Sequence, residues 1–282
     1  MSGANDLERP GPMRDLAGRS AIVTGGASGI GLATVRLLGA RGVRVLVVDL
    51  DEDGARRAAE EVGGWSIRAD VSRSSEWAKV VTVAKELLGG LDLAHLNAGV
   101  TTGEAELAMV SDEAYRRIMG VNVDGVVFGI RALVPVMSAG GGGAIVVTAS
   151  LAGLVAFGGD PIYTLTKHAL IGLVRSLPPQ LSPMGISVNA LCPGLVNTPL
   201  LDGPSRELLE GSGFPLIAPE EVAAAVVACM AGGQTGQAVV VQAGIEPTAY
   251  RFSRAPGPRT DGGSPGLPPG PLLAHDQVPP TP

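Results

Sequence analysis

A tyrosine and a lysine, Tyr163 and Lys167, are four positions apart in the sequence Tyr-Thr-Leu-Thr-Lys. On a helix, residues at i and i+4 lie on one face, so the phenol and the ammonium would be neighbours. A free phenol has a pKa of about 10 and is a poor base at neutral pH, but a nearby lysine charge favours the phenolate and lowers that pKa. The pair therefore suits proton transfer at an alcohol or carbonyl oxygen. Such pairs also arise by chance on many helices, so the neighbouring motifs have to decide.

A serine, Ser150, precedes this pair and follows the apolar run Ala144–Thr148, which predicts a buried strand. Active groups of open α/β sheets lie beyond the carboxyl ends of the strands. The intervening segment, residues 151–161, can bring Ser150 next to Tyr163, where its hydroxyl could hold a substrate oxygen. The alternative is a serine that only caps the strand end.

A glycine-rich loop, Gly25-Gly26-Ala27-Ser28-Gly29-Ile30-Gly31, joins an expected strand to an expected helix. Glycines let the backbone approach a diphosphate closely, and the helix start offers free N–H groups and a positive end. The spacing Gly-x-x-x-Gly-x-Gly differs from the commoner Gly-x-Gly-x-x-Gly motif. A purely structural glycine turn is therefore an alternative.

An acidic residue, Asp49, ends the next apolar run and follows Gly29 by 20 residues. A carboxylate there can accept hydrogen bonds from both adenosine ribose hydroxyls and would repel the 2′-phosphate of NADP. No lysine or arginine lies within the loop or directly after Asp49. We therefore expect NAD rather than NADP, with a solvated acid at a strand end as the alternative.

The elements that must position these residues follow from the hydrophobic pattern. Apolar β-branched runs predict strands at Ala21–Thr24, Val43–Asp49, Leu91–Asn97, Ala144–Thr148, Ile186–Leu191 and Ala238–Val241. Helical spacing predicts helices at Gly31–Ala40, Gly54–Val62, Ser74–Leu88, Asp112–Met137, Ile162–Gln180 and Pro219–Met230. Continuous apolar strands that alternate with helices are typical of a parallel sheet covered on both faces. We predict an α/β fold: a single-domain, Rossmann-type, doubly wound parallel sheet.

The bulk composition limits the other possibilities. The chain has 282 residues and is 45% hydrophobic, with a net charge of −6. Residues 1–16 are expected to be a flexible leader, 17–250 the Rossmann-type domain, and 251–282 a disordered Pro/Gly-rich tail. The negative charge does not suggest nucleic acid or an anionic membrane. Two cysteines are too few for a disulfide framework, so a cytoplasmic location is expected, and no zinc-type ligand spacing predicts a metal.

Further motifs follow in a recognisable order: Thr24-Gly25-x-x-x-Gly29-x-Gly31, Asn97-Ala98-Gly99, Asn122, Ser150, Tyr163-x-x-x-Lys167, and Pro193-Gly194 with Thr198. Over residues 17–245 the chain thus resembles the short-chain dehydrogenase/reductase family. The resemblance implies that Tyr163 is the general acid/base, that Lys167 binds the nicotinamide ribose, and that Ser150 orients the substrate. It also implies that Asn122 holds a water in a proton relay, and that the protein is a homo-tetramer or homo-dimer. The implied cofactor-binding residues are Thr24, Gly25, Ser28, Gly29, Ile30, Gly31, Asp49, Asp70, Val71, Asn97, Ala98, Gly99, Tyr163, Lys167, Pro193, Gly194, Val196 and Thr198.

The expected substrate region comprises the segments 101–109, 151–162 and 199–216, which are mostly apolar. An apolar secondary alcohol or ketone fits these segments, and parts of the chain resemble the hydroxyprostaglandin and hydroxysteroid dehydrogenases. The alternatives are an NADPH-dependent 3-oxoacyl reductase and a catalytically silent regulator that binds the cofactor. Asp160, three residues before Tyr163, could face the substrate or be a solvated loop acid. Pro178-Pro179 is expected to kink the helix that begins near Tyr163.

Overall fold

The computed structural model describes residues 15–253, which form eight strands in one sheet. The strands are β1 (Ser20–Thr24), β2 (Arg44–Asp49), β3 (Trp65–Arg68), β4 (Leu93–Leu96), β5 (Gly143–Thr148), β6 (Ile186–Pro193), β7 (Ala238–Gln242) and β8 (Ile245–Ala249). The helices are α1 (Gly29–Ala40), α2 (Glu52–Glu61), α3 (Ser74–Leu88), α4 (Asp112–Met119), α5 (Gly125–Ala139), α6 (Pro161–Ser176), α7 (Pro178–Leu181), α8 (Gly203–Gly211) and α9 (Pro219–Ala231). A π-helical segment, Gly120–Asp124, joins α4 to α5.

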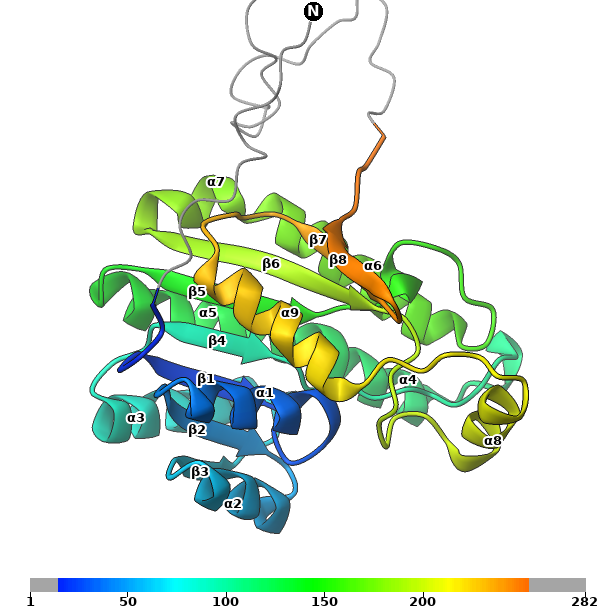
Figure 1. Ribbon diagram of the computed structural model, residues 1–282, viewed down its shortest axis with the longest axis horizontal. Helices are drawn as coiled ribbons and strands as arrows, with labels where there is room; N and C mark the ends of the chain where they lie inside the picture. The colour runs from blue at the N-terminus through cyan, green and yellow to red at the C-terminus, as the bar shows by residue number, and fades with distance from the viewer. Residues whose placement is uncertain (1–14, 254–282) are drawn as a thin grey trace, which may run out of the picture.

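The sheet lies between two helical layers (Figure 1). Alternate residues of each strand point to opposite faces: Ile22 joins the core on the side of α3, α5 and α6, whereas Ala21 and Val23 join the core on the side of α1, α2 and α9. Both faces are therefore buried, which explains why the central strands are continuous apolar runs.

The strand order is β3-β2-β1-β4-β5-β6-β7-β8, with β1 to β7 parallel and β8 antiparallel to β7. After β3 the chain crosses to the other side of β1 and continues as β4. Ligands of open α/β sheets bind at such a switch point, outside the carboxyl ends of the strands. The predicted doubly wound α/β fold is confirmed, and residues that follow β1, β4, β5 and β6 all emerge at one edge.

Some element predictions were wrong in detail. Neither β3 nor β8 was predicted, because β3 is short and only partly buried, and β8 contains Pro247 and is exposed throughout. The helix α8 lies within the expected substrate segment 199–216, where no helix was predicted. The predicted helix Ile162–Gln180 divides at Leu177, since Pro178 has no N–H to continue the hydrogen-bond ladder and instead begins α7. The predicted helix Asp112–Met137 contains the π-helical segment.

At each end of the predicted domain, residues 17–250, the chain continues for at least one or two more residues that pack against the core. Leu16 is buried in the core beside β1, and Phe252 packs against the core that includes α6. The remainder of the predicted leader, residues 1–14, and of the predicted tail, residues 254–282, lies outside the described residues.

One helical stretch within the described residues, Asp112–Ala139, is long and apolar enough to cross a membrane by length and composition alone. It packs instead as part of the helical layer: α5 contacts α3 and α4 contacts α6. Leu133 and Met137 of α5 are fully buried. This is the behaviour of a core helix.

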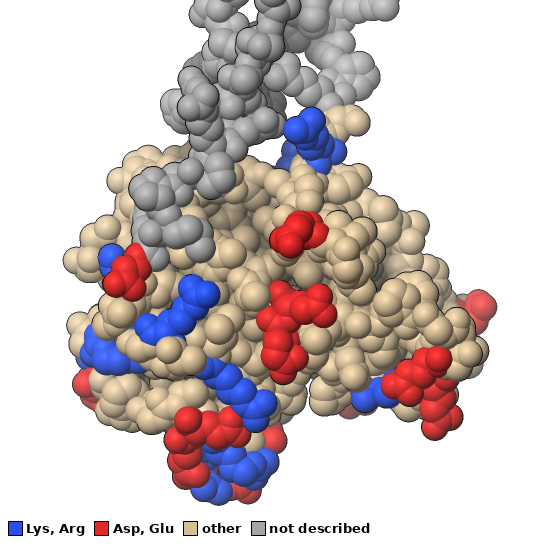
Figure 2. Space-filling model, in the orientation of Figure 1, with Lys and Arg blue, Asp and Glu red and all other residues tan. Residues whose placement is uncertain are grey.

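Charged side chains of both signs are visible on the face seen in Figure 2, in mixed groups at two places and as acidic side chains alone at the centre. Acidic and basic residues occur together over α2, where Arg56 pairs with Asp53 and Glu60, and again at α8. On that face the basic side chains are interspersed with acidic ones.

Candidate active site

Tyr163 and Lys167 lie in the first turns of α6, which begins sharply because Pro161 occupies its first turn and Asp160 caps it. The Asp160 side chain accepts a hydrogen bond from the Tyr163 N–H at 2.8 Å. As the spacing predicts, Lys167 faces the same way as Tyr163, with its Nζ 5.4 Å from the centroid of the phenol ring.

Burial dominates the electrostatics of Tyr163 and raises the pKa of its phenol above the ordinary value. A hydrogen bond with Ser150 lowers this pKa, and the charge of Asp160 raises it. The expectation that Lys167 lowers the pKa of Tyr163 below its ordinary value is therefore wrong for this structure. Desolvation of the phenolate is the largest cause of the shift, and Lys167 Nζ, which lies over the ring, donates to another acceptor.

That acceptor is the main-chain oxygen of Thr148, at the end of β5, to which Lys167 Nζ donates at 2.8 Å. The side chain of Lys167 is buried, and burial lowers the pKa of Lys167 to about 8. The amine of Lys167 therefore titrates near physiological pH.

Ser150 lies where the sequence predicts, directly after β5 and next to Tyr163. Its Oγ accepts a hydrogen bond from the Ala152 N–H at 3.1 Å, within a short 3-10 turn. The hydroxyl proton is therefore left to donate toward Tyr163 or a substrate oxygen. Ser150 therefore both caps this turn and contacts the phenol of Tyr163, so the two alternatives do not exclude each other.

Asn122 lies in the π-helical segment and is fully buried. Its amide N–H groups donate to Val100 O at 2.9 Å and to Thr166 Oγ1 at 3.1 Å, and its Oδ1 accepts from Val100 N at 2.8 Å. A Cβ placed on Gly99 would lie 3.5 Å from both Asn122 Oδ1 and Lys167 Nζ. The absence of a side chain at Gly99 thus leaves space beside both groups, as a relay between them would need, although both amide protons of Asn122 already have protein partners.

The glycines of the loop after β1 are required by space. A Cβ on Gly31 would clash with the carbonyl oxygen of Gly25, and a Cβ on Gly25, whose φ is +63°, would lie 2.9 Å from the Ala98 Cα. Ser28, the residue before α1, is exposed and makes no side-chain cap, and the first turn of α1 carries no acidic residue. The start of α1 therefore presents free N–H groups and a positive end, which suits a diphosphate.

Asp49 lies at the end of β2 and faces this loop. Its Oδ2 accepts a hydrogen bond from Ala27 N at 2.9 Å, and its Oδ1 accepts one from Asp51 N at 3.0 Å. Each carboxylate oxygen keeps a further lone pair for a ligand hydroxyl. The carboxylate is thus held rigidly beside the glycine loop, in the place that the sequence predicts for an adenosine ribose.

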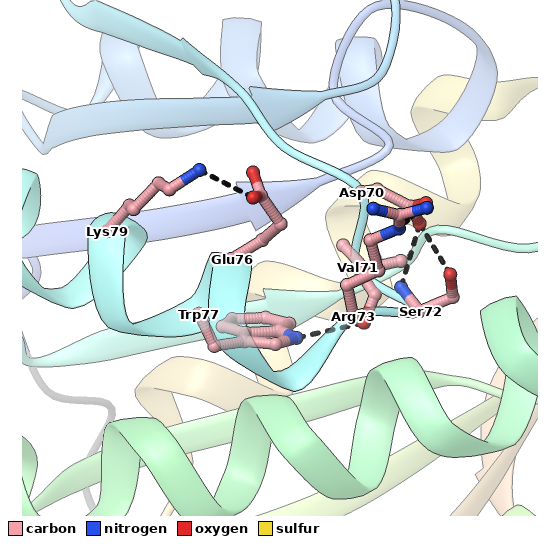
Figure 3. A network of polar contacts seen from close by, with 7 residues as sticks. All are labelled: Asp70, Val71, Ser72, Arg73, Glu76, Trp77 and Lys79. Atoms are coloured by element: carbon pink, nitrogen blue, oxygen red, sulfur yellow. Dashed lines mark hydrogen bonds and ion pairs between the residues drawn. The ribbon is translucent and has the colours of Figure 1, made fainter.

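The predicted adenine contact, Asp70-Val71, follows β3 and is held by its own neighbours (Figure 3). Asp70 Oδ1 accepts hydrogen bonds from the Ser72 hydroxyl at 2.6 Å and the Ser72 N–H at 3.0 Å, and its Oδ2 lies 3.5 Å from Arg73 Nε. The Trp77 indole N–H donates to Val71 O at 3.0 Å. Asp70 and Val71 are thus held in place, and some of the lone pairs of the Asp70 carboxylate already accept hydrogen bonds from protein groups.

Thr24 and Asn97 tie the ends of β1 and β4 together from behind the loop. Thr24 Oγ1 accepts from Asn97 N at 2.9 Å and from Ala98 N at 3.2 Å. Asn97 Nδ2 donates to Thr24 O at 3.1 Å and to Gly25 O at 3.2 Å. The polar side chains of these two predicted cofactor residues therefore serve mainly to hold the loop in shape.

On the far side of the crevice, β6 ends at Pro193, and Gly194 leaves room for the side chain of Gln242. Val196 pairs with Ile217 in an isolated parallel bridge. A Cβ on Gly29 would lie 3.1 Å from Thr198 Cγ2, so Thr198 does lie against the glycine loop. The structure thus brings the predicted cofactor-binding residues together at the carboxyl edge of the sheet.

The three predicted substrate segments carry many exposed apolar side chains. The most exposed are Leu107, Met109, Val155, Phe157, Leu200, Leu208 and Phe214. Asp160 is neither a solvated acid nor free to face a substrate, because only 3% of it is exposed and both its oxygens accept backbone hydrogen bonds.

Sequence reasoning missed three residues that shape the site. His95 and Thr148 are buried and linked, with His95 Nε2 2.8 Å from Thr148 Oγ1, and Thr148 Oγ1 donates to Asn97 Oδ1 at 3.0 Å. A polar residue inside an apolar strand pattern was the available signal for both. Arg206, on the unpredicted helix α8, donates to the carbonyl oxygens of Thr198 at 2.8 Å and Leu201 at 3.3 Å, and no local pattern indicates this contact.

Comparisons with known proteins agree with this geometry. The family model for short chain dehydrogenases matches residues 19–207. The 2,5-dichloro-2,5-cyclohexadiene-1,4-diol dehydrogenase of Sphingobium indicum is 38% identical over 192 residues, 67% of this chain and 77% of that protein. The 3-alpha-(or 20-beta)-hydroxysteroid dehydrogenase of Mycobacterium tuberculosis is 36% identical over 217 residues, 75% of this chain and 82% of that protein.

A solved structure is also similar. The 3-ketoacyl-(acyl-carrier-protein) reductase from Brucella melitensis, complexed with NADH, matches with a TM-score of 0.77 and 31% identity. The match covers 81% of this chain and 98% of that one.

Proposed function

Because this chain belongs to the short-chain dehydrogenase/reductase family, we propose that it transfers a hydride between NAD(H) and an apolar secondary alcohol or the corresponding ketone. Family membership confirms the predicted class of oxidoreductase with a nicotinamide cofactor. The observation that carries the proposal is the meeting of Tyr163, Lys167 and Ser150 at the carboxyl edge of the sheet, where a Cβ on Gly99 would lie 3.5 Å from Lys167 Nζ.

The residues present fit a dinucleotide. Gly25, Gly29 and Gly31 pack so closely on neighbouring protein atoms that a side chain at any of them would displace the loop. This tight loop, together with the uncapped start of α1, suits a diphosphate. Asp49 would accept hydrogen bonds from the adenosine ribose, and Lys167 would bind the nicotinamide ribose. Bound NAD(H) supplies the site of hydride gain and loss, and the protein handles the proton.

The proton chemistry belongs to Tyr163. Because its pKa is raised, the phenol is protonated at neutral pH and is ready to donate that proton to a carbonyl oxygen in reduction. In oxidation the phenol must first lose this proton, and the phenolate then takes the proton of the substrate hydroxyl. Ser150, whose hydroxyl proton is available, holds the substrate oxygen next to the phenol.

The preference for NAD rests on Asp49. A 2′-phosphate at this position would meet a carboxylate that two backbone N–H groups hold in place. Since like charges at close range are repelled, we expect kcat/KM with NADH to exceed that with NADPH by about tenfold or more. Asp49→Ser should make this ratio smaller, because it weakens the binding of NADH and removes the charge that repels NADPH. A preference of the unaltered protein for NADPH would overturn the assignment.

The substrate class rests on the exposed apolar side chains of the three predicted substrate segments. Leu107, Met109, Phe157 and Phe214 would remain in contact with water unless an apolar ligand covers them. Two of the similar proteins are named for cyclic alcohol substrates, a cyclohexadiene diol and hydroxysteroids. We therefore favour a cyclic or lipid-like secondary alcohol over a sugar or a hydroxy acid.

The test is the formation of NADH, followed by absorbance, with a panel of cyclic, steroid and fatty secondary alcohols alongside sugars and hydroxy acids. We expect turnover to be confined to the apolar members. Activity that occurs only with charged or polyhydroxylated compounds would contradict the substrate class.

A second candidate is the reduction of a 3-oxoacyl thioester, and it is favoured by the similarity to the Brucella melitensis reductase. The same protein tested with a 3-oxoacyl thioester and NADH or NADPH distinguishes the two. A catalytically silent regulator is disfavoured because Asn122, Ser150, Tyr163 and Lys167 are all present and assembled.

Tyr163→Phe separates catalysis from binding, because it removes the phenolic oxygen but keeps the ring. We expect kcat to fall by about 10²- to 10⁴-fold, with the affinity for NADH nearly unchanged. Unaltered turnover in this variant would remove the basis of the enzymatic proposal.

A cytoplasmic location and a homo-tetramer or homo-dimer remain proposals, as do the absence of a metal, of nucleic acid and of a membrane partner. Size-exclusion chromatography with light scattering tests the oligomeric state.

A further inference from the structure

We propose that Asp160 is a positioning residue that ties the segment after β4 to the first turn of α6, so that the apolar substrate segment 101–109 and Tyr163 are held as one unit. The proposal rests on the function proposed above, since it assigns this segment to substrate binding. It explains why a carboxylate is buried at the start of the helix that carries Tyr163.

The two oxygens of Asp160 bind two different segments. Oδ1 accepts from the Tyr163 N–H at 2.8 Å and thereby caps α6. Oδ2 accepts from the Thr102 N–H at 2.8 Å and the Gly103 N–H at 3.2 Å. A helix cap needs only one side-chain oxygen, so the second oxygen has a separate task.

The chemistry of this contact requires an acceptor at both ends of the side chain. Both oxygens receive N–H donors, which matches a carboxylate, an acceptor at every lone pair. An asparagine would turn one end into an N–H donor that faces other donors, and a serine could keep the cap but could not reach both segments.

The tied segment has little else to hold it. Leu107 and Met109 are 62% and 71% exposed, and the segment has no fully buried side chain between Thr101 and Met109. Arg117 of α4 donates to Thr101 O at 2.9 Å, which holds the beginning of the segment from the other side. The position of the segment relative to Tyr163 therefore depends largely on the buried carboxylate of Asp160.

The carboxylate also acts on Tyr163 through its charge. The ionisable and hydroxyl groups around the phenol are Ser150 after β5, Lys167 on α6 and Asp160 at its start; Glu104 and Arg117 lie on the tied segment and on α4. Asp160 raises the pKa of Tyr163, so its removal should shift the pH profile of alcohol oxidation to lower pH. A purely structural cap would leave that profile where it is.

The decisive variant is Asp160→Ser, which can still cap α6 but has no oxygen for Thr102 and Gly103. Hydrogen exchange of the peptide that spans residues 100–110, measured on the full protein without substrate, should become faster. The KM for the alcohol should rise and kcat should fall, together by about 10- to 100-fold in kcat/KM, because small misplacements at a reacting centre are costly. The Kd for NADH should stay within about twofold, since the variant keeps an oxygen that can cap the Tyr163 N–H and loses only the contacts with Thr102 and Gly103.

The matched control is Ser111→Ala, which removes the cap of α4, where Ser111 Oγ accepts from Ala114 N at 3.1 Å. It should lower the melting temperature about as much as Asp160→Ser but leave the KM for the alcohol and the pH profile unchanged. Asp160→Asn, which preserves volume, should reproduce the exchange and kinetic changes of Asp160→Ser.

Unchanged exchange in residues 100–110 and an unchanged KM in Asp160→Ser would overturn the proposal. The exchange measurement needs no turnover, so it tests the tie even if the substrate assignment fails. Failure of the unaltered protein to oxidise any apolar alcohol would count against the proposed function instead.

Discussion

Burial decides the state of the ionisable side chains in this site. The pKa of Tyr163 is raised chiefly by desolvation, that of Lys167 is lowered by it to about 8, and that of Cys192, behind them, is raised to about 12. All three shifts favour the neutral form, as expected where water is excluded. The proton therefore resides on the phenol, and in the proposed reaction oxidation begins by removing it.

The pH dependence of alcohol oxidation follows from this state. Because the pKa of Tyr163 is raised, only a small fraction is phenolate at neutral pH, and that fraction grows with pH. We expect kcat/KM for oxidation, which reports the free enzyme, to rise from pH 6 to pH 8 by up to about tenfold per unit. Ser150→Ala should lower the rate at every pH, since it removes the hydrogen bond that favours the phenolate. A rate independent of pH over this range would contradict the raised pKa.

His95 gives a second prediction at the residue scale. Thr148 donates its one proton to Asn97 Oδ1, so His95 Nε2 must donate to Thr148, and Nδ1 is left without a partner. Complete burial lowers the pKa of His95 to about 3. An unfolded histidine has a pKa of about 6.5, so between these values the unfolded chain binds a proton that the folded protein does not, and stability falls as the pH falls.

His95→Leu should remove this dependence. Urea unfolding at pH 7, 6 and 5 should show that the free energy of unfolding of the unaltered protein declines more steeply below pH 6.5, by about 1 kcal/mol per pH unit, than that of the variant. Parallel pH dependences in the two proteins would show that His95 is not buried in the neutral form.

At the scale of elements, the site is the junction of β1 and α1 with the ends of β4, β5 and β6. The junction is tight because Gly31, in the first turn of α1, packs directly on the carbonyl of Gly25. Asn97 then binds the carbonyls of Thr24 and Gly25 from the end of β4. The shape of the loop thus depends on close backbone contact between elements that are distant in sequence.

Gly31→Ala tests this junction. The added methyl group would clash with Gly25 O and push the loop away from α1, so NADH should bind more weakly by about tenfold or more, as measured by titration calorimetry. Gly172→Ala is the matched control, because Gly172 lies on α6 with open space around the added methyl group. It should bind NADH normally and be more stable by up to about 1 kcal/mol, through its higher helix propensity.

At the scale of the whole molecule, β8 forms one edge of the sheet, and the residues that follow it pack against α6. β8 is exposed along its length and pairs antiparallel with β7. Beyond it, Phe252 lies beneath the guanidinium of Arg175, 3.8 Å from the ring centroid, and contacts Tyr250 edge to face. These contacts anchor the chain after β8 on α6, far from the glycine loop.

Phe252→Ala should therefore destabilise the protein without altering its kinetics. The loss of packing and of the cation–π contact should lower the melting temperature by about 3–6 °C, measured by differential scanning fluorimetry. Phe214→Ala, in the substrate segment and 49% exposed, should do the reverse: the melting temperature should hold and the KM for the alcohol should rise. Equal effects of the two variants on stability would show that the terminal contacts do not anchor the chain.

The sequence alone determined the alternation of strands and helices, the parallel sheet, and the residues that surround the crevice. These follow from local patterns: hydrophobic period, glycine spacing, and the four-residue spacing of Tyr163 and Lys167. The same patterns could not reveal α8, β3 or β8, because exposed or short elements carry weak periodicity.

Only the tertiary structure decided how the assembled residues behave. Asp160 is a buried tie because Thr102 and Gly103, nearly 60 positions earlier, fold back onto it. His95 and Thr148 meet because β4 and β5 are neighbours in the sheet. The pKa of Tyr163 rises because the whole fold excludes water from the phenol. Burial and long-range contacts depend on the packing of the entire chain, so the sequence indicated which residues could carry the proton chemistry, and the fold set their protonation.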